Sequence, residues 1–373
     1  MPKDTHSRFF TITEFTKLDW VGNTSIEMSD GQFVYNFNLQ QYDVEFPYMQ
    51  HYKCRLELDR PDFCHVPGNS LLLMLATKSH PKAFVRRAAV RQTWAKDREL
   101  SGFVVKHIFL MAQSPDPVTM QQVVEEAAEF KDILLWDFAE SHHNLSLKER
   151  CFIEWMHHKC KEAEFIFKGD DDEFVNPRVM VNYLKETANG SIAIHGFIHS
   201  GSDSERDGKY KISNATYPSD KYPIFPSGGG YIIPGAYIAA LYRASTWMPL
   251  FPLDDVYFGF LGLAAQVSYR HDCRFRVSGM EYQRCAYKEA LVVHGIEPEK
   301  MVYIWLDVQQ EDPCVPSTSW IGSLTLLLLV PAILFISLLV FFYFNKYGIT
   351  PKLLEILSNK RTAWWKTDAL SSY

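Results

Sequence analysis

The sequence predicts an α/β protein with a largely parallel sheet, followed by one C-terminal transmembrane helix. Between residues 70 and 170, short apolar runs alternate with segments of helical spacing, as in βαβ units. One of these runs, residues 165–169, ends directly in three consecutive aspartates. Residues 321–344 contain no charged side chain and are long enough to cross a bilayer.

The predicted elements begin after residues 1–50, which have no steady period and are expected to form a stem or irregular region. The run at 70–77, SLLLMLAT, is too short to span a membrane and has the length of a buried strand. Ser146 and Glu149 have the spacing of a capping box at a helix start. The other predicted strands are residues 103–111, 132–136 and 165–169, and the predicted helices are residues 83–94, 118–130 and 144–160.

The three aspartates, Asp170, Asp171 and Asp172, form the candidate active centre. In parallel sheets, ligands bind beside the carboxyl ends of strands, and these side chains follow one such end. Clustered carboxylate oxygens suit a divalent cation that carries a phosphate. A solvated acidic loop is the competing interpretation, because Asp-x-Asp sequences also occur by chance.

Three stretches of the second half carry further candidate groups. Three glycines at 228–230 precede an apolar strand, where they either allow a ligand to approach the backbone or mark a bulge. Asp254 and Asp255 lie at a predicted helix start, where acids also compensate the helix dipole. His294 ends an apolar run, and such a histidine is either structural or a ligand of a metal or phosphate.

Composition argues against a general nucleic-acid-binding surface. The 38 basic and 44 acidic residues give a net charge of −6. Aromatic residues make up 14% of the chain, which permits stacking on sugar rings but equally serves cores and membrane interfaces. The expected partners are therefore small or neutral molecules.

Residues 321–344 are predicted to span a membrane, with Trp320 and Tyr343 at the two interfaces. The tail that follows, residues 345–373, is rich in Lys, whereas the residues before the span are mostly acidic. The positive-inside rule therefore places the tail in the cytoplasm and the large domain on the luminal side. Seven scattered cysteines fit a secretory compartment, as do sequons at positions 23, 144, 189 and 214.

Six motifs occur in order along the chain: RRAAVRQTW at 86–94, DILLWDF at 132–138, NLSLK at 144–148, FKGDDD at 167–172, SGGGY at 227–231 and DDVYFG at 254–259. This ordered set resembles the β1,3-glycosyltransferase family of the Golgi, which contains galactosyl- and N-acetylglucosaminyltransferases. The resemblance makes residues 51–315 the predicted catalytic domain.

The resemblance implies a GT-A fold, in which a nucleotide-sugar-binding sheet is joined to an acceptor-binding half, and it implies a UDP-sugar donor and Mn²⁺. Asp255 matches the catalytic base of the family. The implied metal ligands are Asp172, Asp170 and His294. The implied donor-binding residues are Arg86, Arg91, Lys148, Asp170, Gly228, Gly229 and Gly230.

These roles agree with the needs of an inverting transfer, in which a base takes the acceptor proton and a cation neutralises the leaving diphosphate. The forms KGDDD and VHGIEPEKM resemble the N-acetylglucosaminyl branch. The predicted reaction is therefore transfer from UDP-GlcNAc to the 3-hydroxyl of a β-galactose-terminated glycan. A β1,3-galactosyltransferase that uses UDP-galactose and a non-catalytic glycan-binding relative are the alternatives.

The family also implies a Golgi membrane protein with a luminal catalytic domain, and a homodimer is a further expectation. Three features of the sequence depart from the family pattern. The apolar span follows the catalytic domain instead of preceding it. Glu140 stands where the family usually has Asp, and Leu261 stands in place of a cysteine, so that Cys273 becomes the substitute partner or a disulfide is lost.

Overall fold

The computed structural model describes residues 25–68, 70–187 and 192–310, the backbone of residues 7–11, and Cys314 with several positions between 333 and 346. The chain divides into two compact units, Met1–Gln310 and Glu311–Tyr373. Most of the predicted transmembrane segment, residues 321–344, lies outside the described residues, as does the tail at 347–373. No helix within the described part of the chain is long and apolar enough to cross a membrane.

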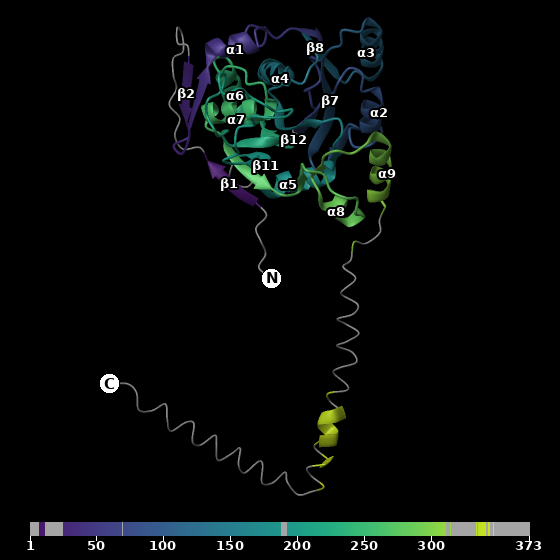
Figure 1. The fold of residues 1–373 in the computed structure, drawn as a ribbon. Coiled ribbons are helices and arrows are strands. Elements are labelled where there is room, and N and C mark those ends of the chain that lie inside the picture. Colours follow the sequence, from purple (N-terminus) through teal and green to yellow (C-terminus); the bar gives the residue numbers. More distant parts are fainter. Residues whose placement is uncertain are drawn as a thin grey trace, which may run out of the picture. The chain divides into compact units, whose positions relative to one another are not determined.

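A ten-stranded mixed sheet forms the centre of the first unit (Figure 1). In sheet order its strands are β1 (Ser7–Thr11), β13 (Ser268–Asp272), β11 (Ile194–His199), β12 (Phe225–Pro234), β9 (Ala163–Asp170), β5 (Leu71–Lys78), β7 (Phe103–Gln113), β8 (Ile133–Ala139) and β4 (Leu56–Leu58), with β6 (Arg98–Leu100) beside β7. The strands β9, β5, β7 and β8 are parallel, which confirms the predicted parallel sheet for this half. The other half differs, because β12 runs antiparallel to both β9 and β11.

Helices cover both faces of the sheet, so the central strands are continuous apolar runs. In β5, Leu72 and Met74 pack into one core cluster, whereas Leu73 and Leu75 pack into the other, as alternating side chains require. The first cluster includes α4 (Leu145–Lys159), α6 (Ile238–Ser245) and α7 (Asp254–Ala265). The second includes α2 (Phe84–Gln92), α3 (Pro117–Phe130), α5 (Pro177–Thr187) and α9 (Pro298–Val308), three of which lie to one side in Figure 1.

Helix α4 starts at its predicted position, but its capping differs from the prediction. Asn144 occupies the N-cap position and forms no side-chain capping bond. The Ser146 hydroxyl instead donates to the Phe251 carbonyl, and the Glu149 carboxylate pairs with Lys168. Both side chains are fully buried and bond to groups of other elements, so neither caps the helix.

The N-terminal region expected to be a stem contributes to the core instead. The hairpin of β2 (Ser25–Ser29) and β3 (Val34–Asn38) and the helix α1 (Leu39–Glu45) precede the main sheet. Tyr35, Phe37 and Tyr42 of this region are buried in the first core cluster. The strands are only five residues each, so their two-residue alternation gives too short a pattern to outweigh the surrounding polar residues.

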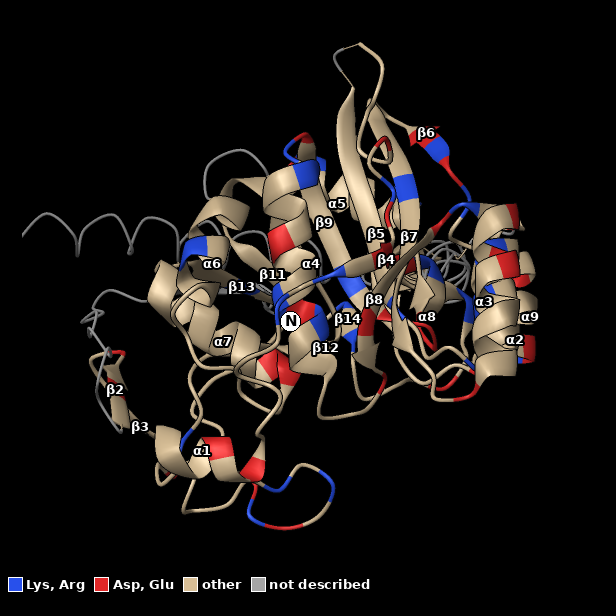
Figure 2. Ribbon diagram, turned by 90° about the horizontal axis from the view of Figure 1, so that it is seen from above, with Lys and Arg blue, Asp and Glu red and all other residues tan. Residues whose placement is uncertain are grey.

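Two disulfides join the segment before β5 to helix α4. They link Cys54 to Cys151 and Cys64 to Cys160, and the free cysteine of the described residues is Cys273. The remaining elements are η1 (Gly235–Tyr237), α8 (Arg284–Glu289) and a small sheet of β10 (Phe174–Val175), β15 (Val292–Val293) and β14 (Phe275–Arg276). Acidic and basic segments are interspersed over the ribbon, and an acidic pair opens α7 (Figure 2).

Candidate active site

A cavity of about 940 Å³ opens at the carboxyl ends of β5 and β9, where the sequence predicts the ligand site. Lys78 and Asp170, the last residues of these two strands, both line it. The start of β12 and the start of α7 form further parts of its wall. The volume is within the range of sites for small molecules and cofactors.

The cavity brings together the three predicted metal ligands. One ligand atom from each of Asp170, Asp172 and His294 lies within 4.8 Å of the other two. The small sheet accounts for this geometry, because Phe174 of β10 pairs with Val293 of β15. Residues before one strand and after the other therefore meet, and His294 Nε2 lies 3.5 Å from Asp172 Oδ1.

This group of residues fits a bound divalent cation. Asp172 Oδ1 is buried and accepts no hydrogen bond from the described residues. Such an atom is costly to bury unless it has a partner, and a cation would supply one. Two carboxylate oxygens and one imidazole nitrogen suit Mn²⁺, which accepts mixed oxygen and nitrogen ligands.

Asp171, the middle residue of the triplet, is held away from this group. Its carboxylate accepts a hydrogen bond from Ser79 at 2.7 Å and lies 3.4 Å from Arg86 Nη1. Burial raises the pKa of Asp171, although Ser79 and Arg86 act in the opposite direction. Arg86 also lies 3.1 Å from Asp172 and lines the cavity.

The acidic pair at the start of α7 faces the same cavity. Lys78 Nζ lies 2.8 Å from Asp254 Oδ2 and 3.1 Å from Asp170 Oδ1, so it bridges the acidic pair and the strand-end carboxylate. Lys168 Nζ lies 3.8 Å from the same Asp254 oxygen. The aspartate at the helix start is thus an ion-paired group and not only a dipole-compensating one.

Asp254 and Asp255 differ in their ionisation. Burial raises the pKa of Asp255 to about 6, with a second contribution from the negative charge of Asp254. Burial also acts to raise the pKa of Asp254, but Lys78 and Lys168 hold it well below its usual range. Two neighbouring carboxyls with separated pKa values are typical of sites that perform acid–base chemistry.

The glycine segment lies against both groups of residues. A Cβ on Gly228 would meet the Asp255 side chain at 3.8 Å, and one on Gly229 would meet the His294 ring at 3.4 Å. Both glycines line the cavity. Gly230 has φ of +106°, a conformation that favours glycine, and packs against Phe167 and Val292. It is not among the lining residues.

Like Arg86, the other two predicted donor-binding cations are already paired with carboxylates. Lys148 lines the cavity, but it is buried and its Nζ contacts both oxygens of Glu140, at 2.9 and 2.8 Å. Arg91, which is also predicted to bind the donor, is not among the residues that line the cavity. Its guanidinium binds Asp132 at 2.7 and 2.9 Å and Glu126 at 2.5 Å.

Helix geometry explains why only one of the two arginines reaches the cavity. Arg86 and Arg91 are five residues apart on α2, which separates them by roughly 140° around the helix axis. The sequence patterns also give no sign of the roles of Lys78 and Lys168. Each is one lysine within or at the end of a buried strand, and no periodic pattern distinguishes such a residue from one that reaches solvent.

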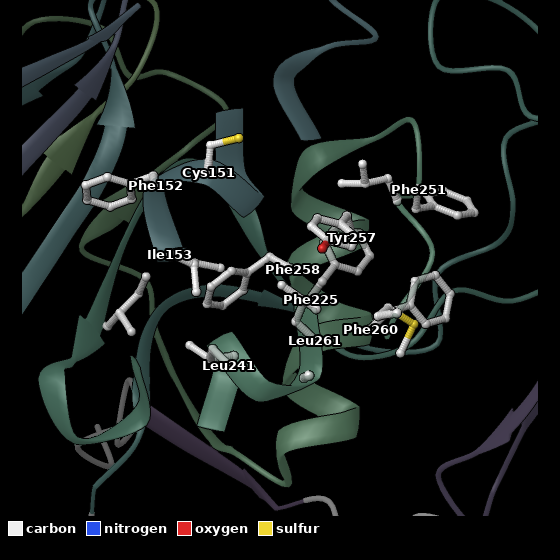
Figure 3. Close-up of a cluster of buried hydrophobic side chains, with 14 of the residues drawn as sticks. Cys151, Phe152, Ile153, Phe225, Leu241, Phe251, Tyr257, Phe258, Phe260 and Leu261 are labelled. Carbon is white, nitrogen blue, oxygen red and sulfur yellow. The ribbon is translucent and has the colours of Figure 1, made fainter. Parts of the chain in front are cut away.

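Aromatic packing fixes the helix that carries the acidic pair (Figure 3). Tyr257, Phe258 and Phe260 of α7 are fully buried. Phe260 packs against Phe251 with ring centroids 5.4 Å apart, and Phe258 packs against Tyr231 of β12 at 4.9 Å. Because the first turn of α7 is anchored in this way, Asp255 is held beside the glycine segment.

Comparison with known proteins decides the family. Residues 85–273 match the sequence model of the family described as galactosyltransferase. The chain belongs to the galactosyltransferase family. One relative of this galactosyltransferase-family enzyme is human N-acetyllactosaminide beta-1,3-N-acetylglucosaminyltransferase 2. The two sequences are 33% identical over 281 residues, which cover 70% of this chain and 69% of the relative.

Two further relatives carry names of the same kind. Human acetylgalactosaminyl-O-glycosyl-glycoprotein beta-1,3-N-acetylglucosaminyltransferase is 32% identical over 277 residues, covering 69% of this chain and 72% of the relative. Lactosylceramide 1,3-N-acetyl-beta-D-glucosaminyltransferase A of Danio rerio is 33% identical over 273 residues, covering 70% and 69%. The predicted resemblance to β1,3-glycosyltransferases, and to their N-acetylglucosaminyl branch, is confirmed.

Proposed function

We propose that this galactosyltransferase-family enzyme transfers N-acetylglucosamine from UDP-GlcNAc to the 3-hydroxyl of a β-galactose-terminated glycan, with inversion at the anomeric carbon. The observation that carries the proposal is the presence of two separate acidic centres in one cavity. One is the group of Asp170, Asp172 and His294, and the other contains Asp255. The names of the three relatives support N-acetylglucosamine as the sugar that is transferred.

The sheet divides into two parts that would correspond to the two halves of a GT-A enzyme. The parallel strands β5, β7, β8 and β9 would form the nucleotide-sugar half, and β11, β12 and the segment between them would form the acceptor half. Ser202 and Tyr210 of that segment line the cavity beyond the glycine strand. Glycan specificity would therefore depend on a segment remote in sequence from the aspartate triplet.

Asp170, Asp172 and His294 would hold Mn²⁺, which when bound supplies positive charge against the diphosphate of the leaving UDP. Arg86 adds a cationic group at the same end of the site, where it can pair with a phosphate oxygen. Lys78 keeps Asp170 and Asp254 in fixed positions, because its buried Nζ contacts both.

Asp255 would accept the proton of the acceptor 3-hydroxyl as that oxygen attacks the anomeric carbon. A pKa of about 6 leaves this carboxyl ionised at neutral pH yet more basic than an ordinary aspartate. The adjacent Asp254 stays ionised between its two lysines and does not compete for the proton. Gly228 leaves space for the sugar next to the Asp255 carboxylate.

The two disulfides support a place for the catalytic unit in an oxidising compartment, and we propose the Golgi lumen with attachment to its membrane. A homodimer remains a prediction.

A donor and acceptor screen tests the proposal. Purified enzyme with Mn²⁺ would be offered UDP-GlcNAc and UDP-galactose in turn, with lactose and N-acetyllactosamine as acceptors. We expect UDP release and a β1,3-linked N-acetylglucosamine product only with UDP-GlcNAc, identified by nuclear magnetic resonance of the new linkage. Equal or faster turnover of UDP-galactose would contradict the choice of sugar, and acceptor binding without any transfer would contradict the enzymatic role.

A further inference from the structure

We propose that Asn214 is a site of N-linked glycosylation and that Asn144, which also has a sequon, is not. The sequence carries Asn-Ala-Thr at 214–216 and Asn-Leu-Ser at 144–146. A sequon is a weak signal alone, because many such triplets are never modified. The structure separates the two sites by the surroundings of each asparagine. Asn23 and Asn189 lie outside the described residues.

An oxidising compartment is the first requirement, because N-glycosylation takes place in the secretory pathway. The disulfides Cys54–Cys151 and Cys64–Cys160 both belong to the catalytic unit. Disulfides of this kind persist in secretory compartments and are rare in the cytosol. The domain that carries Asn214 therefore has the covalent features of a protein that meets the glycosylation machinery.

Asn214 lies on the outside of a firmly anchored turn. Ile212 and Tyr217, on either side of it, are buried in the first core cluster, and the Tyr217 N–H donates to the Ser213 carbonyl at 3.0 Å. Asn214 itself is exposed, and its side chain makes no hydrogen bond to any described residue. A large oligosaccharide on its Nδ2 would project into solvent and break no contact of the fold.

The surroundings of Asn144 differ from those of Asn214. Its Nδ2 donates to the Ala139 carbonyl at 2.9 Å, and the residue is half-buried at the start of α4. Ser146 of the same sequon donates to the Phe251 carbonyl. Its burial does not distinguish the two sequons, because Thr216 of the other one is also fully buried. His142 and Leu145, on either side of Asn144, line the active-site cavity. A glycan here would break the turn and occupy the mouth of the site.

The reaction joins the Asn214 amide to a sugar supplied by another molecule of the secretory pathway. The amide nitrogen forms a bond to the anomeric carbon of a lipid-diphosphate-linked oligosaccharide. The bond from that carbon to the diphosphate oxygen breaks, the lipid diphosphate leaves, and the amide nitrogen loses one proton. Asn214 lies between β11 and β12 but is not among the residues that line the cavity, so the glycan would occupy the outer surface of the proposed acceptor half.

Peptide mapping of the full-length protein, expressed in a eukaryotic secretory host and purified in its folded and active form, tests the proposal. Trypsin places the two asparagines in separate peptides, residues 212–221 and residues 132–148. Removal of glycans by peptide-N-glycosidase in heavy-oxygen water converts each glycosylated Asn to labelled Asp. We expect the label at Asn214 in most molecules and no label at Asn144.

Two variants provide matched controls. Asn214→Gln should lose one step of the glycosidase mobility shift while kcat/KM stays within about twofold of wild type, since the residue does not line the cavity. Thr216→Ser keeps the sequon and should keep the glycan. An unlabelled Asn214 in active protein, or a labelled Asn144, would overturn the proposal. So would a glycosidase shift that is unchanged in Asn214→Gln.

Discussion

The charges around Asp255 come from three different elements. Asp254 precedes it on α7, Lys78 ends β5, and Lys168 belongs to β9. Tyr222 and Tyr231 also lie near the carboxyl pair, and the negative charge of Asp255 contributes to the raised pKa of each, after burial itself. The basicity of the proposed catalytic residue is therefore set first by burial, and then by the balance between the Asp254 anion and the cations of Lys78 and Lys168.

This balance predicts opposite pH shifts for two neighbouring substitutions. In the wild type, kcat/KM should fall as the pH drops below about 6, because Asp255 becomes protonated. Asp254→Asn removes a negative charge, so the pKa of Asp255 falls and the acid limb moves to lower pH. Lys78→Met removes a positive charge, so the acid limb moves to higher pH.

The test is to measure kcat/KM from pH 5 to pH 8 for both variants at saturating Mn²⁺. A substitution that only disturbs the structure would lower kcat/KM without moving the acid limb of the two variants in opposite directions. Lys148→Met serves as a control for loss of a buried lysine, since Lys148 pairs with Glu140 and not with the acidic pair. Shifts in the same direction for Asp254→Asn and Lys78→Met would contradict the proposed coupling.

The sequence predicts which acidic side chains lie together in the cavity, but it does not predict which cationic side chains pair with them. Asp170, Asp172, Asp255 and His294 each follow or begin an apolar element, and such positions converge at one edge of an α/β sheet. Arg91 lies within the same motif as Arg86, but the motif alone does not show which face of the helix points at the cavity. The sequence contains 38 basic residues, and nothing local marks the ones that become buried partners.

Among the elements, the contact of α7 with β12 positions Asp255, the proposed catalytic residue. Gly259 is the point of closest approach, because a Cβ there would lie 2.7 Å from the Phe225 Cβ and 2.8 Å from the Ile224 carbonyl oxygen. Ordinary side chains do not tolerate such distances, and the second neighbour is backbone. Helix and strand can therefore pack this closely only with glycine at this position.

Gly259→Ala should consequently destabilise the protein and lower its activity. Helix propensity alone would favour alanine by about 1 kcal/mol. Overpacking costs typically ~1–3 kcal/mol, so we expect a net loss of stability and a displaced Asp255. Thermal unfolding and kcat would be measured together, with Ala264→Gly on the same helix as the control for propensity. A variant more stable than the wild type, with unchanged kcat, would show that the contact is looser than described.

The sequence predicts helices and strands correctly where the hydrophobic pattern extends over many residues, and it fails where the pattern is short. The strands and helices between residues 70 and 170 all occur, because each has a continuous buried face. The hairpin of β2 and β3 was missed because its two buried positions per strand are surrounded by polar residues. The antiparallel placement of β12 could not be predicted either, since strand direction depends on the path of the connecting chain.

For the whole catalytic unit, the two disulfides act as long-range links. Their cysteines are separated by 97 and 96 residues in the sequence, and both attach the segment before β5 to α4. In the chain-entropy account, a loop of this length contributes roughly 4–5 kcal/mol to stability. The same helix packs against the main sheet and carries Lys148, so the links also stabilise one wall of the cavity.

Replacing one of these links should lower the unfolding temperature markedly. We expect the double variant Cys54→Ser with Cys151→Ser to lose several kcal/mol of stability, on the order of the chain-entropy contribution. The matched control is Cys273→Ser, because Cys273 is free and its replacement removes no link. Differential scanning calorimetry of the three proteins gives the comparison. Equal unfolding temperatures for the wild type and the double variant would contradict the role of the link.

In the proposed reaction, Asp255 is the base, and the group of Asp170, Asp172 and His294 serves the donor. The most direct test measures UDP-GlcNAc turnover and UDP affinity for Asp255→Asn in parallel with the wild type at saturating Mn²⁺. We predict that kcat falls roughly 100- to 10,000-fold, as for loss of a general base, while the Kd for UDP stays within about twofold. Asp255→Asn with near wild-type kcat, or with weakened UDP binding in proportion to its lost turnover, would contradict the account.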